Sequence, residues 1–259
     1  MKKKIGIISF SEIEKDSRVK RQLSALEDKY EIFFFGYGKS ISKKINHFSL
    51  KEKNNYFYKV FYCLLLLCKR FKLYTSIRFN YTQIMRIIER NNIEVLILND
   101  STSWPILGFF KSPQYCVIDA HEYTPEELTD NILWEIFYKE YKLWCSKFVK
   151  YGGVHFCVEK NLCKKWTKFS GKEFIELRNS SNYFNIPKDK RKIFKSDSLK
   201  YIHHGLATPS RKIENMIFAT KKAGKKYRGN FFLTGKNREY INYLKEIGHK
   251  NHCEIFDPI

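Results

Sequence analysis

The sequence predicts an α/β protein made of two doubly wound domains, the second of them incomplete. Short, continuous apolar runs alternate with amphipathic segments of helical spacing, which is the pattern of strands and helices in a parallel α/β fold. This alternation continues to residue 180, stops in a polar and basic stretch at 181–198, and starts again at residue 199. With 259 residues, of which 43% are hydrophobic, the chain can build two packed cores. We therefore predict domains at 1–180 and 199–259, joined by a linker at 181–198.

The strands predicted for the first domain are apolar without interruption, as expected for a parallel sheet whose two faces are both covered. They lie at 4–10, 30–37, 93–98, 115–120, 154–158 and 173–177. The segments between them repeat apolar residues at intervals of three and four, which indicates helices packed on the sheet. These helices are predicted at 19–26, 56–74, 81–90, 104–110, 133–149 and 160–169. Such a Rossmann-like sheet binds its ligand in a crevice at the carboxyl ends of its strands.

The second domain begins a new unit of the same kind, with strands at 199–203, 230–234 and 253–256. A turn at 205–210 leads into a helix predicted at 211–223, and a second helix is predicted at 239–247. These elements form about half of an ordinary doubly wound domain. We therefore expect a second Rossmann-like domain that is incomplete and has an open sheet edge.

A formal net charge of +21 is the strongest feature of the composition. It favours anionic partners, namely nucleic acid, an acidic membrane face or phosphorylated substrates. The charge alone does not choose among them, because lysine is spread over the whole chain and solvated lysine is common on any surface. No nucleic-acid recognition motif is present, and the aromatic residues fall inside apolar strands and helices. We predict that the protein does not bind nucleic acid, and a basic nucleic-acid-binding protein is the weakest alternative.

The seven cysteines lack the paired spacing of a disulfide framework or a zinc site, so we expect reduced thiols in a cytoplasmic protein. His249, His252 and Cys253 form one small cluster of ligand types. No fourth ligand lies near them in the sequence, and a structural zinc site takes four ligands. We therefore predict no metal site.

The sequence predicts no membrane span. The most apolar run, 60–68, is shorter than the roughly 20 residues that a transmembrane helix needs, and the N-terminus does not have the pattern of a signal peptide. The basic and aromatic segments 56–74 and 134–150 allow peripheral contact with an anionic membrane. The alternative is that each is a buried helix with one solvated face. We expect a cytoplasmic protein, with peripheral binding at the inner membrane face as its only membrane contact.

Several short motifs follow the predicted strands in order. They are Asp16-Ser17-Arg18-Val19, Ile97-Leu98-Asn99-Asp100, Asp119-Ala120-His121-Glu122, Leu177-Arg178-Asn179, Tyr201-Ile202-His203-His204-Gly205 and Leu233-Thr234-Gly235. In this order, and nearly from end to end, the chain resembles the GT-B glycosyltransferases, in particular the retaining family 4 group. The family's paired glutamates, in the second half of the donor-binding lobe, would lie beyond Ile259. We therefore expect that lobe to be truncated here.

The resemblance implies a nucleotide-sugar-dependent transferase. Such an enzyme moves a sugar from a nucleoside diphosphate sugar to an acceptor hydroxyl, here with retention of the anomeric configuration. We expect a hexosyl transfer in surface glycan or polysaccharide biosynthesis, with a glycan or a lipid-linked molecule as acceptor. The nucleotide-sugar is a substrate, and no cofactor is expected. The alternative is an inactive, truncated relic of this fold that acts as an interaction partner.

The departure of a nucleoside diphosphate requires positive charge, which GT-B enzymes usually supply without a metal. The turn at Gly205 is followed by Arg211 and Lys212, which we predict to open a helix. Cations together with a helix N-terminus suit phosphate oxygens, so these three residues are the predicted donor-phosphate site. The alternative is that Arg211 and Lys212 are ordinary solvated residues of a first helical turn.

His121 and Glu122 are the predicted catalytic residues, because they follow a buried strand and so reach the ligand crevice. His121 would hydrogen-bond the transferred sugar or orient the acceptor; otherwise it is a packed loop histidine. Glu122 would otherwise cap the next segment or bond the backbone. Asp16, Arg18 and Asp100 are predicted to contact the acceptor or to line the crevice. Their alternatives are an N-cap for Asp16, a surface position for Arg18 and a helix cap for Asp100.

Overall fold

The computed structural model of the chain describes residues 2–53, 55–110, 115–126, 132–180, 185, 198–235 and 237–257. The chain divides into two compact units, Met1–Ser181 and Asn182–Ile259. Each unit has its own sheet and its own hydrophobic core. The predicted linker at 181–198 lies outside the described residues, except for residues 185 and 198.

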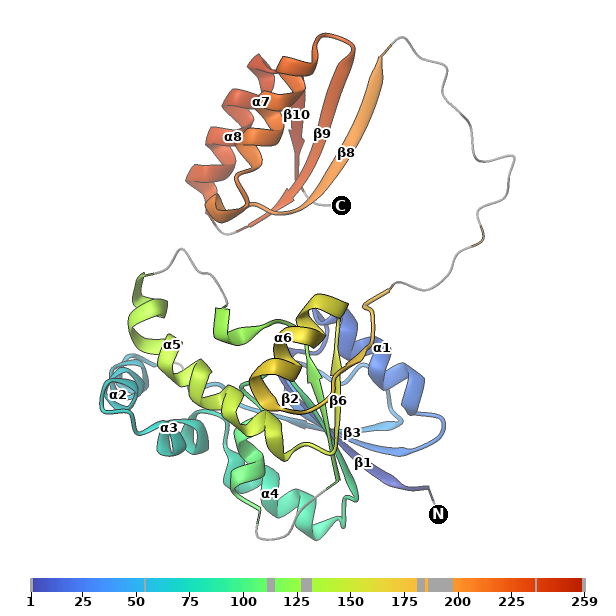
Figure 1. Cartoon of the computed structure of the whole chain (residues 1–259), viewed down its shortest axis with the longest axis vertical. Helices are drawn as coiled ribbons and strands as arrows, with labels where there is room; N and C mark the ends of the chain where they lie inside the picture. Colours follow the sequence, from blue (N-terminus) through green and yellow to red (C-terminus); the bar gives the residue numbers. More distant parts are fainter. Residues whose placement is uncertain are drawn as a thin grey trace. The chain divides into compact units, whose positions relative to one another are not determined.

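The first unit is built on a sheet whose seven described strands are all parallel, in the order β3-β2-β1-β4-β5-β6-β7 (Figure 1). The strands are β1 (Lys4–Glu12), β2 (Glu31–Tyr37), β3 (Ile45–Ser49), β4 (Val95–Asn99), β5 (Tyr115–Ala120), β6 (Val154–Cys157) and β7 (Ile175–Glu176). The strand order changes direction between β1 and β4. In doubly wound folds this switch point is where ligands bind, beside the carboxyl ends of the strands. The predicted fold class is confirmed.

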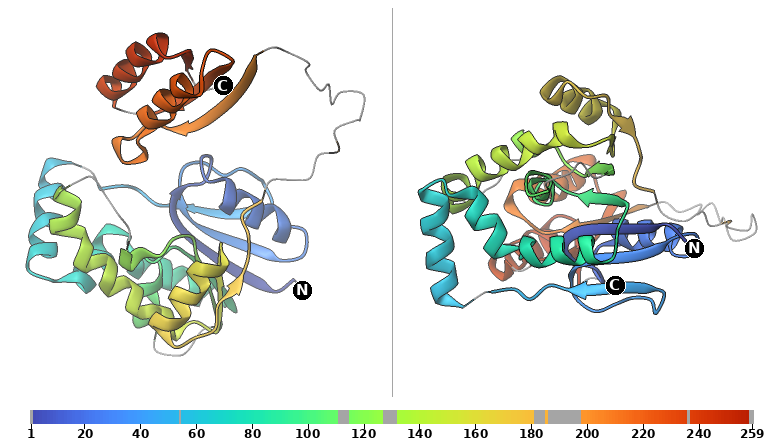
Figure 2. Two further views of the ribbon diagram at one scale, coloured as in Figure 1. Left: turned by 45° about the horizontal axis from the view of Figure 1, so that its top comes forward. Right: turned by 90° about the horizontal axis from the view of Figure 1, so that it is seen from below.

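Two hydrophobic cores lie on the two faces of this sheet. Helix α1 (Ser17–Leu26) covers one face, where its Val19 and Leu23 pack in one cluster with Ile7 and Phe34. The other face carries α2 (Tyr56–Leu67), α3 (Phe71–Arg78), α4 (Tyr81–Arg90), α5 (Ile132–Ser146) and α6 (Lys160–Ser170). Figures 1 and 2 show α2 and α5 close to each other within this unit, and the two helices are in contact.

The apolar segment 56–74 forms two helices where the sequence predicts one. Helix α2 ends because Lys69 adopts a left-handed backbone conformation, with φ of 54°. The amide of Arg70 then donates to the carbonyl of Leu65 at 2.8 Å, and the amide of Lys69 donates to that of Leu66 at 3.0 Å. This is the hydrogen-bond pattern of a Schellman cap. Lys69 occupies its left-handed position, where glycine is the usual residue. The chain turns there so that Phe71, at the start of α3, is buried against Trp144.

Other first-unit elements differ from the prediction in extent. The sequence does not predict strand β3. Only its Ile45 is buried and the rest of the strand is at most partly covered, so the segment has no continuous apolar run that would indicate a strand. The helix expected at 104–110 is a 3₁₀ segment, and the long helix expected at 133–149 is α5 followed by another such turn. These 3₁₀ segments are η1 (Trp104–Gly108), η2 (Thr124–Glu126) and η3 (Lys147–Tyr151).

The described part of the second unit is a parallel sheet in the order β10-β9-β8, with two α-helices (Figure 1). Its elements are β8 (Leu199–Leu206), η5 (Pro209–Arg211), α7 (Ile213–Ala223), β9 (Tyr227–Thr234), α8 (Arg238–Lys250) and β10 (Cys253–Phe256). The core is formed where Ile217 and Leu244 of the two helices meet Phe231 and Leu233 of β9. Figure 1 shows α7 and α8 on the same face of the sheet.

Two boundaries in the second unit correct the sequence prediction. Strand β8 does not turn at Gly205 but continues to Leu206, because it stays paired with β9 up to Thr234. Arg211 and Lys212 do not open the helix. Arg211 ends η5, and Lys212 precedes α7 in a left-handed conformation with φ of 45°.

Candidate functional site

A pocket lined mainly by polar and charged residues lies at the carboxyl ends of β1, β5 and β6, beside the switch point of the first sheet. Its volume is about 620 Å³. It is lined by Ser11, Glu12, Lys15, Asp16, Ser17, Arg18, His121, Glu122, Val158 and Asn179. Four predicted site residues therefore share one pocket, although more than a hundred positions separate Arg18 from His121 in the sequence.

Asp16 is the N-cap of α1. Its Oδ1 accepts hydrogen bonds from the amides of Arg18 at 3.1 Å and Val19 at 3.0 Å. Its Oδ2 accepts from the hydroxyl of Ser11 at 2.7 Å. These bonds satisfy the helix start, as a capping aspartate does. Asp16 therefore borders the pocket while it fixes the backbone that carries Arg18.

Arg18 is not a surface residue. Its guanidinium forms a two-pronged ion pair with Asp119 of β5, in which Nε donates to Oδ2 at 3.1 Å and Nη2 donates to Oδ1. The side chains are 11% and 3% exposed. The remaining terminal nitrogen, Nη1, is buried and has no hydrogen-bond partner among the described residues. A bidentate pair holds this remaining donor in a fixed direction.

Asp119 belongs to this arrangement, although the sequence interpretation left it out of the site. The sequence did carry a signal, because a carboxylate stands inside the apolar run of β5 and buried carboxylates are rare unless they are paired. Burial favours protonation, but contacts with His121 and Arg18 outweigh it and hold the pKa of Asp119 below its ordinary value. The residue is therefore the buried anion of the site.

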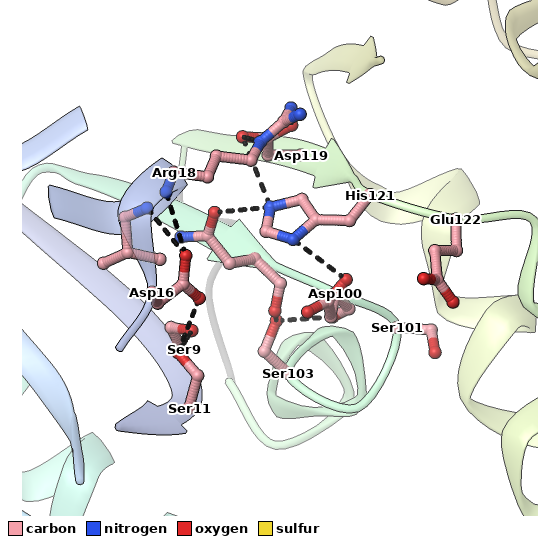
Figure 3. A network of polar contacts seen from close by, with 12 residues as sticks. Ser9, Ser11, Asp16, Arg18, Asp100, Ser101, Ser103, Asp119, His121 and Glu122 are labelled. Carbon is pink, nitrogen blue, oxygen red and sulfur yellow. Dashed lines mark hydrogen bonds and ion pairs between the residues drawn. The ribbon is translucent and has the colours of Figure 1, made fainter. Parts of the chain in front are cut away.

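Figure 3 shows His121 between Asp119 and Asp100. A chain of side-chain hydrogen bonds also leads from Asp119 to His121. Gln22 donates to the carboxylate of Asp119 at 3.3 Å, and Asn99 donates to Gln22 Oε1 at 3.0 Å. The Oδ1 of Asn99 lies 3.2 Å from Nε2 of His121. Because a carboxylate only accepts, both amides are oriented by it, and Asn99 must accept from His121. The network assigns a proton to Nε2 of the ring.

The second nitrogen of His121 faces Asp100. Nδ1 lies 3.4 Å from Oδ1 of Asp100, and Nε2 is also 3.8 Å from the buried Asp119. Burial lowers the pKa of His121, but its contact with Asp119 and the charges of both carboxylates raise it more, so the net shift is upward from 6.5. Desolvation, with repulsion from Asp16 and Asp119, raises the pKa of Asp100. Both shifts widen the pH range over which each group carries its proton.

Asp100 and Glu122 have distinct places beside this network. Asp100 is not a helix cap: it adopts a left-handed conformation with φ of 61°, and the N-cap of η1 is Ser103, whose side chain does not cap the helix. The side chain of Asp100 is 44% exposed, and it is not among the described residues that line the pocket. Glu122 lines the pocket, and its carbonyl accepts from the indole of Trp166 at 3.1 Å. The arrangement supplies hydrogen-bond donors that the ion pair and the amide chain hold in place.

The three predicted donor-phosphate residues belong to the second unit. Gly205 lies near the carboxyl end of β8, where a Cβ atom would stand 3.2 Å from Nη1 of Arg211. The glycine thus leaves space for the guanidinium against the strand. Lys212 is exposed next to it, and its left-handed backbone is the N-cap of α7. Behind them, Nε2 of His203 is buried and has no partner among the described residues.

No family model and no curated protein matches the sequence. Solved structures do match over almost the whole chain. Sucrose-phosphate synthase from Thermosynechococcus elongatus has a TM-score of 0.68 at 9% identity, covering 100% of this chain and 71% of that one. Anabaena HepE, in complex with UDP and glucose, has a TM-score of 0.64 at 9% identity, with coverage of 99% and 70%. S. aureus MnaA with UDP has a TM-score of 0.55 at 13% identity, with coverage of 99% and 69%.

The chain has the GT-B fold. Both of its units take part in the likeness, since the matches extend over 99% or more of the chain. At these identities the likeness establishes architecture, and function has to be argued from the site. The pocket of the first unit and the cluster of Gly205, Arg211 and Lys212 lie at the carboxyl ends of their own parallel sheets, where α/β folds of this kind bind ligands.

Proposed function

We propose that the protein is a glycosyltransferase that moves a sugar from a nucleoside diphosphate sugar to an acceptor hydroxyl. The observation that carries the proposal is the pocket at the switch point of the first sheet, which Arg18 lines and where its Nη1 has no hydrogen-bond partner within the described part of the chain. The GT-B fold supports it, and the structures of HepE and MnaA were determined with UDP. UDP is accordingly the first nucleotide to test. The resemblance to the family 4 group supports retention of the anomeric configuration.

In this proposal the first unit binds and orients the sugar and the acceptor. Arg18 donates from Nη1 to an oxygen of the ligand, and Asp119 is the positioning residue that holds Arg18 and, through Gln22 and Asn99, His121. Protonated His121 donates to a sugar or acceptor hydroxyl that replaces Asp100 at Nδ1. Such donors, fixed before the ligand arrives, stabilise developing negative charge more than mobile groups do. Glu122 borders the same space.

In the second unit, Gly205, Arg211 and Lys212 are proposed to bind the donor phosphates. Two cations beside the start of α7 suit an anionic group, although they precede the helix instead of forming its first turn. A guanidinium offers paired donors to phosphate oxygens. With charge supplied by these side chains, the proposal needs neither a metal nor a cofactor.

The acceptor is proposed to be a glycan or a lipid-linked molecule in surface glycan or polysaccharide biosynthesis. A net charge of +21 supports a site of action near anionic surfaces. We propose a cytoplasmic location with peripheral binding at the inner membrane face, and no binding of nucleic acid.

The second candidate is an interaction partner without transferase activity. It is favoured by the apolar residues that β8 leaves exposed at one edge of the second sheet. Leu199 is 51%, Ile202 69% and Leu206 44% exposed. An exposed edge strand of this kind can pair with another chain.

Calorimetry with UDP and GDP tests the donor site. Arg211→Ala should abolish binding, because it removes the paired donors next to Gly205. Arg228→Ala is the matched control: it removes the same charge from an exposed position at the other end of the second sheet. Loss of binding in the first variant alone supports the proposal. A wild-type chain that binds neither nucleotide contradicts it and favours the interaction partner.

A further inference from the structure

Helix α2 is apolar on two opposite sides. Its inner side buries Tyr62, Leu65 and Leu66 in the core of the first unit. Its outer side exposes four large apolar residues at intervals of three and four, which together form the α2 outer face. They are Phe57, 71% exposed, Val60, 44%, Leu64, 54%, and Leu67, 56%.

This outer face is unusual for a helix at a protein surface. A surface helix normally has one apolar side and a polar opposite side, whereas a helix that is apolar all round is covered by something. Lys59 is the only charged residue among the 12 residues of α2. Single exposed apolar residues are ordinary, but a contiguous row marks a surface that binds an apolar partner.

Cations surround both ends of the α2 outer face. Between residues 51 and 72 the sequence has six basic residues and a single acidic one, Glu52. The exposed cations are Lys51, Lys53, Lys59, Lys69, Arg70 and Lys72. An apolar row with basic residues at its margins is the composition of helices that lie in the interface of an anionic bilayer. The same charge disfavours a second copy of this chain, which carries +21 itself.

A groove continues this surface beyond the end of α2. Its volume is about 850 Å³, and Lys69, Arg70 and Lys72 share its lining with Phe109 and Trp144. Lys72 lies over the Phe109 ring at 5.1 Å, and Lys69 pairs with Glu140 at 2.9 Å. Aromatic rings beside cations suit the boundary between lipid headgroups and acyl chains.

We propose that the α2 outer face is a docking surface for anionic phospholipid bilayers, with α2 lying in the plane of the membrane interface. Among the described residues, no helix combines the length and the apolar character that crossing a bilayer requires. The 12 residues of α2 extend about 18 Å, against roughly 30 Å of hydrocarbon. Docking brings the first unit to a lipid-linked acceptor, but it does not depend on the proposed sugar transfer.

Vesicle sedimentation tests the surface. The full chain should bind vesicles of phosphatidylglycerol and phosphatidylcholine in about 0.5 M salt, where attraction by charge alone is largely screened. Leu64→Ser combined with Leu67→Ser should weaken binding at least about tenfold, because two apolar side chains no longer enter the bilayer. Phe218→Ser combined with Tyr243→Ser is the matched control and should bind as the wild type does. These control residues are 45% and 43% exposed on α7 and α8 of the second unit.

Two further measurements keep the outcome clear. Circular dichroism should show the same melting temperature for both double variants, and both should bind UDP as the wild type does, so that loss of docking and loss of the donor site are separate results. Equal vesicle binding by the wild type and the α2 variant would overturn the proposal, since charge alone would then explain it. A wild-type dimer that the α2 variant converts to a monomer, without vesicle binding, would overturn it in favour of a second copy.

Discussion

The two units present their candidate residues in different environments. In the first unit, Arg18, His121 and Asp119 are mostly buried and hold one another through ion pairs and oriented amides. In the second unit, Arg211 and Lys212 are exposed and lie on a turn between β8 and α7. The difference follows from the sheets: central residues of β1 are fully buried, whereas β8 alternates exposed and half-buried residues. The first site is thus fixed before a ligand binds, and the second depends more on the ligand itself.

The largest effect is expected when the buried anion of the first unit is removed. Asp119→Ala leaves the guanidinium of Arg18 buried without its partner, which should lower the free energy of unfolding by about 3–5 kcal/mol. Asp28→Ala is the control, because Asp28 pairs with Lys44 at 2.8 Å on the surface and should matter little. Urea denaturation followed by circular dichroism gives both values. If the two variants lost similar amounts of unfolding free energy, the buried Asp119–Arg18 pair would stabilise the protein no more than the exposed Asp28–Lys44 pair does.

Adding one methyl group should change the stability of the protein by different amounts in the two sheets. In β2, a Cβ on Gly36 would lie 2.6 Å from the carbonyl oxygen of Ser9, which cannot move without the sheet. Gly36→Ala should therefore cost about 1–3 kcal/mol of stability. In β8, a Cβ on Gly205 would lie 3.2 Å from the end of the flexible Arg211 side chain and, at an ordinary contact distance, 3.7 Å from Nε2 of His203.

Gly205→Ala should accordingly leave stability within about 0.5 kcal/mol of the wild type and reduce affinity for UDP instead. Thermal unfolding and calorimetry on the two alanine variants distinguish these effects. If Gly205→Ala destabilised the chain as much as Gly36→Ala, the second unit would be as tightly packed at its candidate site as the first.

The pKa values of two histidines should be shifted in opposite directions from the ordinary value. The pKa of His121 is raised above 6.5, because its two carboxylate neighbours outweigh burial. The pKa of His203 is lowered by burial and by the nearby charges of His204 and Arg211. The stability that His121 contributes is present below its unfolded pKa of about 6.5 and is lost as the pH rises through its folded value. The stability that His203 contributes is present above its unfolded pKa of about 6.5 and is lost as the pH falls through its lower folded pKa.

Imidazole NMR resonances measure both values directly. Asp119→Asn should lower the pKa of His121, because it removes the carboxylate whose contact raises that pKa most, and should leave the pKa of His203 unchanged. An unchanged His121 in this variant would mean that Asp119 does not position or charge the ring.

How far the sequence predicts this molecule depends on how local each feature is. The buried strands β1 and β5 follow from their own apolar runs, and Asp16 follows as an N-cap from its place before α1. The end of α2 cannot be predicted in this way. A glycine in the left-handed position would have indicated it, but the residue there is Lys69.

The ion pair between Arg18 and Asp119 joins residues 101 positions apart, and one sequence contains nothing that pairs them. The sequence predicts the start of α7 at residue 211 instead of Ile213 for a related reason. Pairing of β8 with β9 draws Gly205 into the strand and moves the helix start to Ile213, a tertiary effect on a local turn signal.

The most direct test of the central claim is release of UDP from UDP-sugars by the purified chain, with and without candidate glycan acceptors. The account predicts that the wild type releases UDP, that His121→Ala and Arg18→Ala do so far more slowly, and that Arg228→Ala retains the wild-type rate. Absence of release from every nucleotide-sugar tested, or equal rates in all four proteins, would contradict a transferase site built from Arg18, Asp119 and His121.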